Sequence, residues 1–385
     1  MNDLKIVKIE LFKVPPRWLF LKITTQSGII GWGEPVVEGK VDSVAACVRE
    51  IEKYVIGRNA NEIEDIWQIL YRGGFYRGGA ILMSAISGID QALWDIKGKH
   101  LNVPVYELLG GAVRDKMKMY CWIGGDNPDV VLEQAHEKVK AGFKAVKMNA
   151  TGAMDWVSSI KDIKTVSNNI KLLREEFGYE LDISLDFHGR IHKPMVKRLI
   201  DELAPYEPMF IEEPVLTENN NVLKHIYGYT SIPIATGERM YSRWDFKEIL
   251  HQGVVDIIQP DLSHAGGISE VRRIATMAEA YDVALAPHCP LGPVALASCL
   301  HVDFVSANAL IQESSIGIHY NQGYDILDYM SNPEVLDIKN GYIELFKKSG
   351  LGIDIDEDRL IEAAKIGHDW SNPIWRAEDG SFAEW

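Results

Sequence analysis

The chain has little cysteine and no cysteine pattern. None of its four cysteines, Cys47, Cys121, Cys289 and Cys299, forms a Cys-x-x-Cys pair, and the N-terminus MNDLKIVKIE lacks the apolar core of a signal peptide. These absences predict a reduced, cytoplasmic setting without a disulfide framework. Cys289 follows His288, which suggests a nucleophile, but we interpret it as an inert buried thiol.

Long apolar runs and an excess of positive charge are also missing. No stretch approaches the roughly 20 apolar residues that a membrane-spanning helix needs. The 40 Lys and Arg residues against 55 Asp and Glu residues give a net charge of −15. This balance disfavours nucleic acid or an anionic membrane as a partner, so an anionic substrate would need local positive charge. The Gly-rich pieces 73–79 and 264–267 lack the context of a phosphate-binding loop, and the first is a candidate lid.

Six acidic or imidazole side chains recur at an almost constant interval, each at or near the end of a short apolar run. Successive members are separated by 26, 26, 23, 27 and 25 residues. This interval fits one strand, one crossover helix and their loops. The six residues are Asp186, Glu212, Glu238, Asp261, His288 and Glu313. Buried parallel strands that end in polar groups predict a (β/α) barrel with its chemistry at one rim.

The apolar runs number eight when the series is extended in both directions. The expected strands lie at 117–122, 145–149, 182–187, 209–214, 233–238, 256–261, 284–288 and 310–314. Eight strands close a barrel, which we place at residues 116–325.

The residues before the barrel predict a separate α+β domain, residues 1–115. Alternating runs between residues 5 and 34 indicate an antiparallel sheet with a hairpin turn at 26–28, and helical spacing follows near 40–56, 61–71 and 80–98. The segment 326–385 is rich in aromatic residues, which predicts packing against this first domain or a partner subunit.

Three of the carboxylates come from consecutive strands and can converge on one point. Asp186, Glu212 and Glu238 end the third, fourth and fifth expected strands. An unpaired buried carboxylate is costly, so a cluster requires a cation, and oxygen ligands with open positions suit Mg²⁺. Glu213 should point the other way because side chains alternate along a strand.

The imidazoles predict proton transfer. Asp261 and His288 end neighbouring strands, so the carboxylate can fix the tautomer of the ring. His188 lies two residues after Asp186, on the opposite side of the barrel from His288. One histidine can remove a proton from a central substrate while the other delivers one. His264, in the next loop, is interpreted as structural.

The motifs SLDFHGR, FIEEPV, TGERM, QPDLSHAGGI and APHCPLGP, with the NPIWR-to-AEW tail, resemble the mandelate racemase branch of the enolase superfamily over essentially the full length. The resemblance implies a modified (β/α)7β TIM barrel with an N-terminal capping domain completed by the C-terminal tail. It implies Mg²⁺ on Asp186, Glu212 and Glu238. The resemblance also implies that His288 is the general base, supported by Asp261, and that His188 is the general acid. It further implies that Glu313 stabilises the intermediate.

The same resemblance implies dehydration of a sugar acid, with D-galactonate as the expected small-molecule substrate, by a homo-oligomer. By the same resemblance, racemases of this branch carry the pattern Lys-x-Lys, whose second lysine is a base. This chain has Lys147-Met148-Asn149 instead, which argues against a second lysine base. Lys147 either adds positive charge to the site or reaches solvent. Arg17 and Arg77 of the first domain are candidates for substrate recognition or for structural roles. Dehydration of another aldonate such as gluconate, a metal-dependent hydrolase, and a non-catalytic metal or sugar-acid binding protein remain alternatives.

Overall fold

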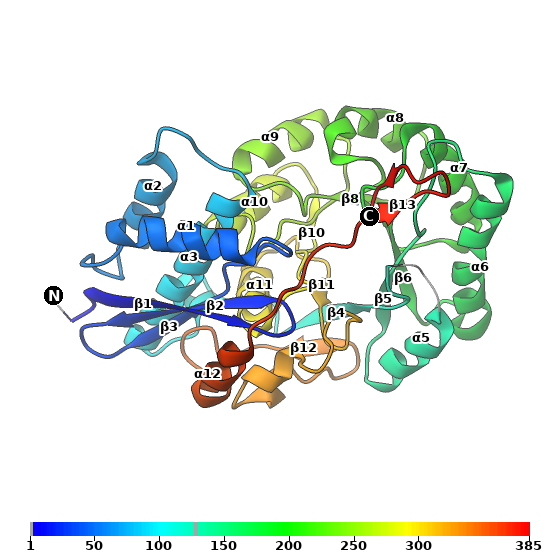
Figure 1. Cartoon of the computed structure of the whole chain (residues 1–385). Helices are drawn as coiled ribbons and strands as arrows, with labels where there is room; N and C mark the ends of the chain where they lie inside the picture. Colours follow the sequence, from blue (N-terminus) through cyan, green and yellow to red (C-terminus); the bar gives the residue numbers. More distant parts are fainter. Residues whose placement is uncertain (1–2, 127–129) are drawn as a thin grey trace.

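A computed structural model describes residues 3–126 and 130–385. The chain forms a small α+β domain beside a larger barrel, and the C-terminal segment crosses from the first to the second (Figure 1). No helix within the described residues is both long and apolar enough to cross a membrane.

The first domain is the expected antiparallel sheet covered by helices. Its strands pair in the order β1-β2-β3. The elements are β1 (Ile6–Val14), β2 (Trp18–Thr25), β3 (Ile30–Gly33), α1 (Val41–Ile51), a 3₁₀ turn (Glu52–Tyr54), α2 (Ile63–Arg72), α3 (Ala80–Leu101) and α4 (Val105–Leu108). The hairpin turn lies between β2 and β3, where the sequence predicts it, and Gly28 there has φ of 84°. The α+β prediction is confirmed.

Glycines allow α3 to lie directly against β3. A Cβ atom at Gly33 would overlap the carbonyl oxygen of Gly88 on α3, and one at Gly31 would overlap that of Ala92. The backbones therefore approach more closely than any side chain would permit. This contact fixes the long helix that reaches the barrel.

The barrel contains all eight predicted strands. Their hydrogen-bonded order is β10-β9-β8-β7-β6-β5-β4-β11, and a parallel bridge between Leu285 and Ala309 joins the two ends. The strands are β4 (Lys116–Trp122), β5 (Ala145–Asn149), β6 (Asp182–Asp186), β7 (Ile211–Glu212), β8 (Ile234–Thr236), β9 (Ile257–Ile258), β10 (Ala284–Leu285) and β11 (Gln312–Ser314). Parallel pairing around the ring confirms the barrel.

Each strand except β11 is followed by a helix on the outside of the barrel. These are α5 (Val131–Lys140), α6 (Ile160–Phe177), α7 (Lys193–Leu203), α8 (Leu223–Tyr227), α9 (Arg243–Gln252), α10 (Gly267–Glu279) and α11 (Pro293–Val305), with 3₁₀ turns at Ala204–Tyr206 and Thr217–Val222. This pattern is the (β/α)7β arrangement that the resemblance implies.

Several strands are shorter than predicted. Asp186 and Glu212 end their strands, but Glu238, Asp261 and His288 lie two or three residues beyond β8, β9 and β10. Pairing stops early because Gly237 has φ of 139°, and because Pro260 and Pro287 have no N–H to donate. These three side chains are therefore carried by loops at the rim rather than by the strands.

The segment after β11 first packs on the first domain. The Tyr329 hydroxyl donates to the carbonyl of Pro15 at 2.6 Å, and its ring lies against Trp18 and Phe20. The elements are two 3₁₀ turns (Ile326–Tyr329 and Pro333–Leu336), β12 (Tyr342–Glu344), α12 (Glu357–Ile366), β13 (Trp375–Arg376) and β14 (Phe382–Ala383). After α12 the chain crosses to the mouth of the barrel (Figure 1).

The first domain also holds the barrel loops that follow β9 and β10. Glu34 accepts hydrogen bonds from the backbone of Gly292 at 2.6 Å and Ala295 at 3.0 Å, at the start of α11. On α3, Asp90 accepts from the backbone of Ser269, and Gln91 donates to the carbonyl of Leu262. The two domains are therefore joined at the rim that carries Asp261 and His288.

We expect Gly33→Ala to destabilise the protein by about 1–3 kcal/mol, because the added methyl group forces α3 away from the sheet. Thermal unfolding followed by circular dichroism should show a lowered midpoint. Gly228→Ala is the matched control: the nearest atom to its added Cβ is 3.9 Å away, so its midpoint should stay close to that of the parent. Equal midpoints for all three proteins would contradict the close contact.

Candidate active site

Three carboxylates meet at the rim of the barrel. Asp186 pairs with Glu212 across β6 and β7, and β8 continues the sheet toward Glu238. One oxygen atom from each of the three lies within 4.8 Å of the others. Asp186 and Glu212 are buried, and the Glu238 side chain is 10% exposed. The structure thus brings together the three residues that the strand spacing singled out.

The cluster is short of positive charge and fits a divalent cation. Burial, followed by the charges of Glu212 and Glu238, raises the pKa of Asp186 well above its usual value, although Lys147 opposes this. Asp186 Oδ2 is buried and has no hydrogen-bond partner within the described residues. Three oxygen donors with an unsatisfied lone pair form a site that a hard cation such as Mg²⁺ would complete.

Lys147 lies inside this cluster and does not reach solvent. Its Nζ atom is 2.8 Å from Glu212 Oε1, 3.0 Å from Glu313 Oε1 and 4.0 Å from Asp186 Oδ2, and the side chain is fully buried. Burial lowers the pKa of Lys147, but Glu212 and Glu313 raise it well above its usual value. The lysine stays charged and offsets one of the carboxylates.

Glu212 and Glu213 point in opposite directions, as expected from strand alternation. Glu212 accepts a hydrogen bond from Gln259 Nε2 at 2.7 Å, inside the cluster. Glu213 instead accepts from Thr236 Oγ1 at 2.6 Å and from the backbone of Gly237 at 2.9 Å. Glu213 therefore supports the loop of Glu238 and is not part of the carboxylate cluster.

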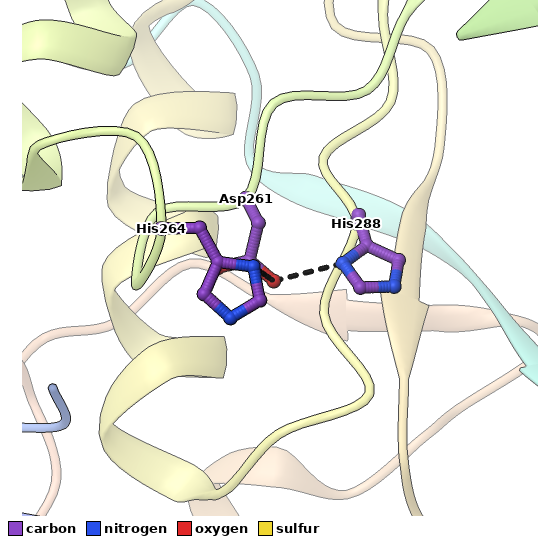
Figure 2. Close-up of side chains that lie close together, drawn as sticks. All are labelled: Asp261, His264 and His288. Atoms are coloured by element: carbon purple, nitrogen blue, oxygen red, sulfur yellow. Dashed lines mark hydrogen bonds and ion pairs between the residues drawn. The ribbon is translucent and has the colours of Figure 1, made fainter. Parts of the chain in front are cut away.

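Asp261 and His288 form a hydrogen-bonded pair. His288 Nδ1 lies 2.9 Å from Asp261 Oδ2 (Figure 2), and the backbone N–H of Ser263 holds Asp261 Oδ1 at 2.6 Å. His288 Nε2 lies 3.3 Å from Glu238 Oε2. Burial lowers the pKa of His288, but Glu238 and Asp261 raise it well above its usual value. A cation on Glu238 would offset part of this effect and leave Nε2 more ready to accept a proton.

His264 connects this pair to the first domain. Its Nδ1 atom is 3.7 Å from Asp261 Oδ2, and its Nε2 atom is 3.4 Å from Glu38 Oε2. Glu38 in turn accepts from Arg17 at 3.1 Å. Asp261, His264 and His288 could be read as a second metal site. The direct hydrogen bond between Asp261 and His288 (Figure 2) favours a hydrogen-bonded network that can hold a proton. The contact of His264 with Glu38 supports the same interpretation.

His188 lies on the other side of the cavity and is neutral in this environment. Burial and the positive charge of Arg190 lower its pKa to about 3. Arg190 donates to His188 Nδ1 at 2.6 Å, and Arg239 donates to the His188 carbonyl at 2.5 Å. Because Nδ1 accepts a hydrogen bond, the ring proton is on Nε2.

Glu313 is held by three donors. It bonds Lys147, the Trp122 indole at 2.5 Å and the backbone N–H of Cys289 at 2.8 Å. Burial raises the pKa of Glu313, but Lys147 and His288 lower it below its usual value. Glu313 is therefore ionised and anchors Lys147. The Cys289 thiol is buried and its pKa is raised by that burial, as expected for an inert thiol.

A cavity of about 360 Å³ joins these groups. Its lining residues include His188, Glu238, His264 and His288 from the barrel, Arg17 and Glu38 from the first domain, and Asp126, Tyr320, Asn372 and Trp385 from other segments. Arg17 is 2% exposed. Phe75 and Tyr76, on the candidate lid, are 91% and 88% exposed and do not line the cavity.

Several lining and supporting residues escape sequence reasoning based on strand ends. Arg190 and Arg239 follow His188 and Glu238 within the same motifs, and that adjacency was the available signal. Asp126, Tyr320 and Trp385 come from loops with no periodic pattern, so nothing in the sequence places them at the cavity.

Comparisons with known proteins agree with this geometry. Residues 15–110 match the mandelate racemase / muconate lactonizing enzyme N-terminal domain, and residues 130–359 match the enolase C-terminal domain-like family. The second match alone covers more than half of the chain.

Solved structures are similar over nearly the whole length. An enolase from Agrobacterium radiobacter, provisionally named a galactarate dehydratase and bound to Na and L-malate, is 32% identical, with 99% of this chain and 100% of that one covered and a TM-score of 0.89. A provisionally named dehydratase from Mesorhizobium loti is 30% identical, with 94% and 98% covered and a TM-score of 0.86. A protein from Labrenzia alexandrii, provisionally named a mandelate racemase/muconate lactonizing enzyme, is 32% identical, with 93% and 99% covered and a TM-score of 0.85.

We expect Mg²⁺ to raise the thermal midpoint of this protein, because a ligand that binds only the folded state stabilises it. Glu212→Gln should remove that increase, since the cluster loses a charged donor. Glu213→Gln is the matched neighbour and should keep it. Calorimetric titration with Mg²⁺ would check the same contrast, and equal binding by both variants would show that the ion lies elsewhere.

Proposed function

Because the chain belongs to the mandelate racemase / muconate lactonizing enzyme family of the enolase superfamily, we propose that it is an Mg²⁺-dependent dehydratase that converts D-galactonate into 2-dehydro-3-deoxy-D-galactonate. One observation carries the proposal. The carboxylate-paired His288 and the arginine-bonded His188 line the same cavity, next to the three-carboxylate cluster.

Asp186, Glu212 and Glu238 would hold the Mg²⁺. When bound, the ion supplies Lewis-acid stabilisation of the negative charge that develops on the substrate carboxylate. The ion and Lys147 together offset three of the four negative charges of Asp186, Glu212, Glu238 and Glu313, which reduces the repulsion of an anionic substrate. Glu313 would stabilise the intermediate near the substrate carboxylate, and its contact with Lys147 keeps that positive charge in place.

His288 removes the proton from C2 of the substrate. Its Nε2 atom faces the cluster, while Asp261 holds Nδ1–H and so fixes the tautomer. The positive charge that forms on the ring is stabilised by the Asp261 carboxylate. His264 lies beside Asp261 and is itself held by Glu38, so the Asp261 carboxylate has a polar neighbour in a fixed position.

His188 delivers a proton from Nε2 to the C3 hydroxyl as the C3–O bond breaks and water leaves. A neutral imidazole can act in this way when its environment holds one tautomer, and Arg190 at Nδ1 offsets the negative charge that the ring acquires. The resulting enol then takes a proton at C3 and becomes the 2-keto-3-deoxy acid. In the same ketonisation the C2 hydroxyl gives up its proton, which balances the proton gained at C3. The proton taken from C2 and the hydroxyl lost from C3 then account for the one water molecule released.

Asn149 supports dehydration over racemisation. Its side chain donates to the carbonyls of Gly125 and Asp126, both at 3.2 Å, and an amide cannot take up a proton at neutral pH. In racemases of this branch the corresponding lysine serves as the second base. The amide here leaves His188 as the proton donor on that side.

Two acidic residues in the cavity lining, Glu38 and Asp126, favour an aldonate over an aldarate. A galactarate substrate would bring a second carboxylate into the cavity. Arg17 is already paired with Glu38, and Asp126 adds a further negative charge nearby. A neutral polyhydroxyl chain suits this surrounding better. Gluconate differs from galactonate only in stereochemistry and is the nearest alternative substrate.

We expect His188→Asn to abolish formation of 2-keto acid while C2 proton exchange with solvent continues, because the base remains intact. His288→Asn should abolish both. The keto acid is measured with a carbonyl reagent, and exchange by proton NMR of D-galactonate in D₂O. Loss of exchange in the His188 variant would mean that His188 has a role other than the acid.

Among acid sugars, we expect D-galactonate to have a kcat/KM at least about tenfold above that of D-gluconate, which corresponds to about 1.4 kcal/mol of discrimination. Galactarate should be a poor substrate because its second carboxylate meets Glu38 and Asp126. The measurement is steady-state 2-keto acid formation across a panel of acids with Mg²⁺. If none of the acids gives product, the protein is not a dehydratase.

A further inference from the structure

The C-terminal segment brings aromatic side chains to the mouth of the barrel. After α12, residues 367–385 cross the barrel and form the short β13–β14 hairpin (Figure 1). The Arg190 guanidinium lies 4.8 Å from the centre of the Trp375 ring. Trp385 and Asn372 line the cavity. This segment therefore contacts both the substrate space and the arginine behind His188.

Trp385 packs directly on the proposed acid. The centroid of its ring lies 5.5 Å from that of the His188 ring, at an interplanar angle of 89°. The ring centroid of Trp122 lies 6.5 Å from the same imidazole, at an angle of 85°. Tyr320 and Trp370 lie 6.5 Å and 6.4 Å from Trp385. The indole is thus held in one orientation by rings around it.

The N–H group of Trp385 is only weakly satisfied by the protein. Nε1 is buried and has no well-aligned hydrogen-bond partner among the described residues. The carboxylate of Asp126 lies close to the indole. Burial raises the pKa of Asp126, but His319 and Tyr320 lower it, and the Trp385 indole adds a smaller contribution in the same direction. A buried indole N–H without a good acceptor is costly, so a ligand that supplies one gains affinity.

We propose that Trp385 is a specificity-determining residue, whose indole N–H binds a hydroxyl group of the substrate chain beyond C3. The inference rests on the proposed function. The aromatic faces of Trp385 and Tyr320, which line the cavity, suit the C–H faces of a polyhydroxyl chain, while Nε1–H and Asp126 suit its hydroxyl groups. The carboxylate end of the substrate would lie at the cation cluster. Trp385 and Tyr320 would therefore contact the other end of the substrate chain.

Trp385→Phe tests this because it keeps an aromatic ring beside His188 and removes the N–H together with the five-membered part of the indole. We expect KM for D-galactonate to rise about five- to tenfold, the size expected for one lost hydrogen bond, with kcat within about twofold of the parent. The inhibition constant of glycolate, which has a carboxylate and a 2-hydroxyl but no further chain, should not change. Trp244→Phe, which alters a tryptophan outside the cavity, is the matched control.

Three results would overturn the inference. These are an unchanged KM in Trp385→Phe, an equal rise in KM and in the glycolate inhibition constant, and an equal rise of KM in Trp244→Phe. Thermal unfolding of each variant distinguishes a lost contact from a lost fold. Failure of the proposed function is a separate result, because the unmodified protein would then turn over no aldonate at all.

Discussion

The structure depends on the balance of charge around Lys147. Four carboxylates, Asp186, Glu212, Glu238 and Glu313, lie at one rim of a barrel whose interior is apolar, and one buried lysine contacts three of them. Removing such groups from water is costly unless opposite charges and hydrogen bonds replace it. Gln259, Trp122 and the backbone of Cys289 provide part of that replacement. A bound cation would offset the negative charge that remains.

The first domain holds the loops that carry Asp261 and His288. Arg17 bonds the carbonyl of Pro290 at 2.6 Å and Glu38 at 3.1 Å, and Glu38 faces His264 beside Asp261. Glu34 caps the helix that follows His288. The hydrogen-bonded pair of Asp261 and His288 is thus carried by two loops that have no regular secondary structure of their own. Their geometry depends on contacts with a separate domain, and those contacts are buried.

The barrel was predictable because its signal is repeated. Eight apolar runs at one interval leave few other folds, and Asp186 and Glu212 end two adjacent strands as expected. Local chain geometry was less predictable: Pro260, Pro287 and Gly237 end their strands early, so Glu238, Asp261 and His288 lie on loops. The burial of Lys147 could not be read from a single residue at a strand end, because it depends on which carboxylates face it across the ring.

The C-terminal segment shows a different limit of prediction from the sequence. Trp375 and Trp385 lie in a segment of low regularity, and only the aromatic density of residues 370–385 indicated that it packs on something. What it packs on follows from long-range geometry: α12 is held at the first domain through the ion pair of Lys22 with Glu357, and the chain beyond it must cross the barrel mouth to reach β13. The cavity is therefore enclosed by three regions that are distant in sequence. Substitutions in the C-terminal segment can therefore alter the lining of the cavity without altering any strand of the barrel.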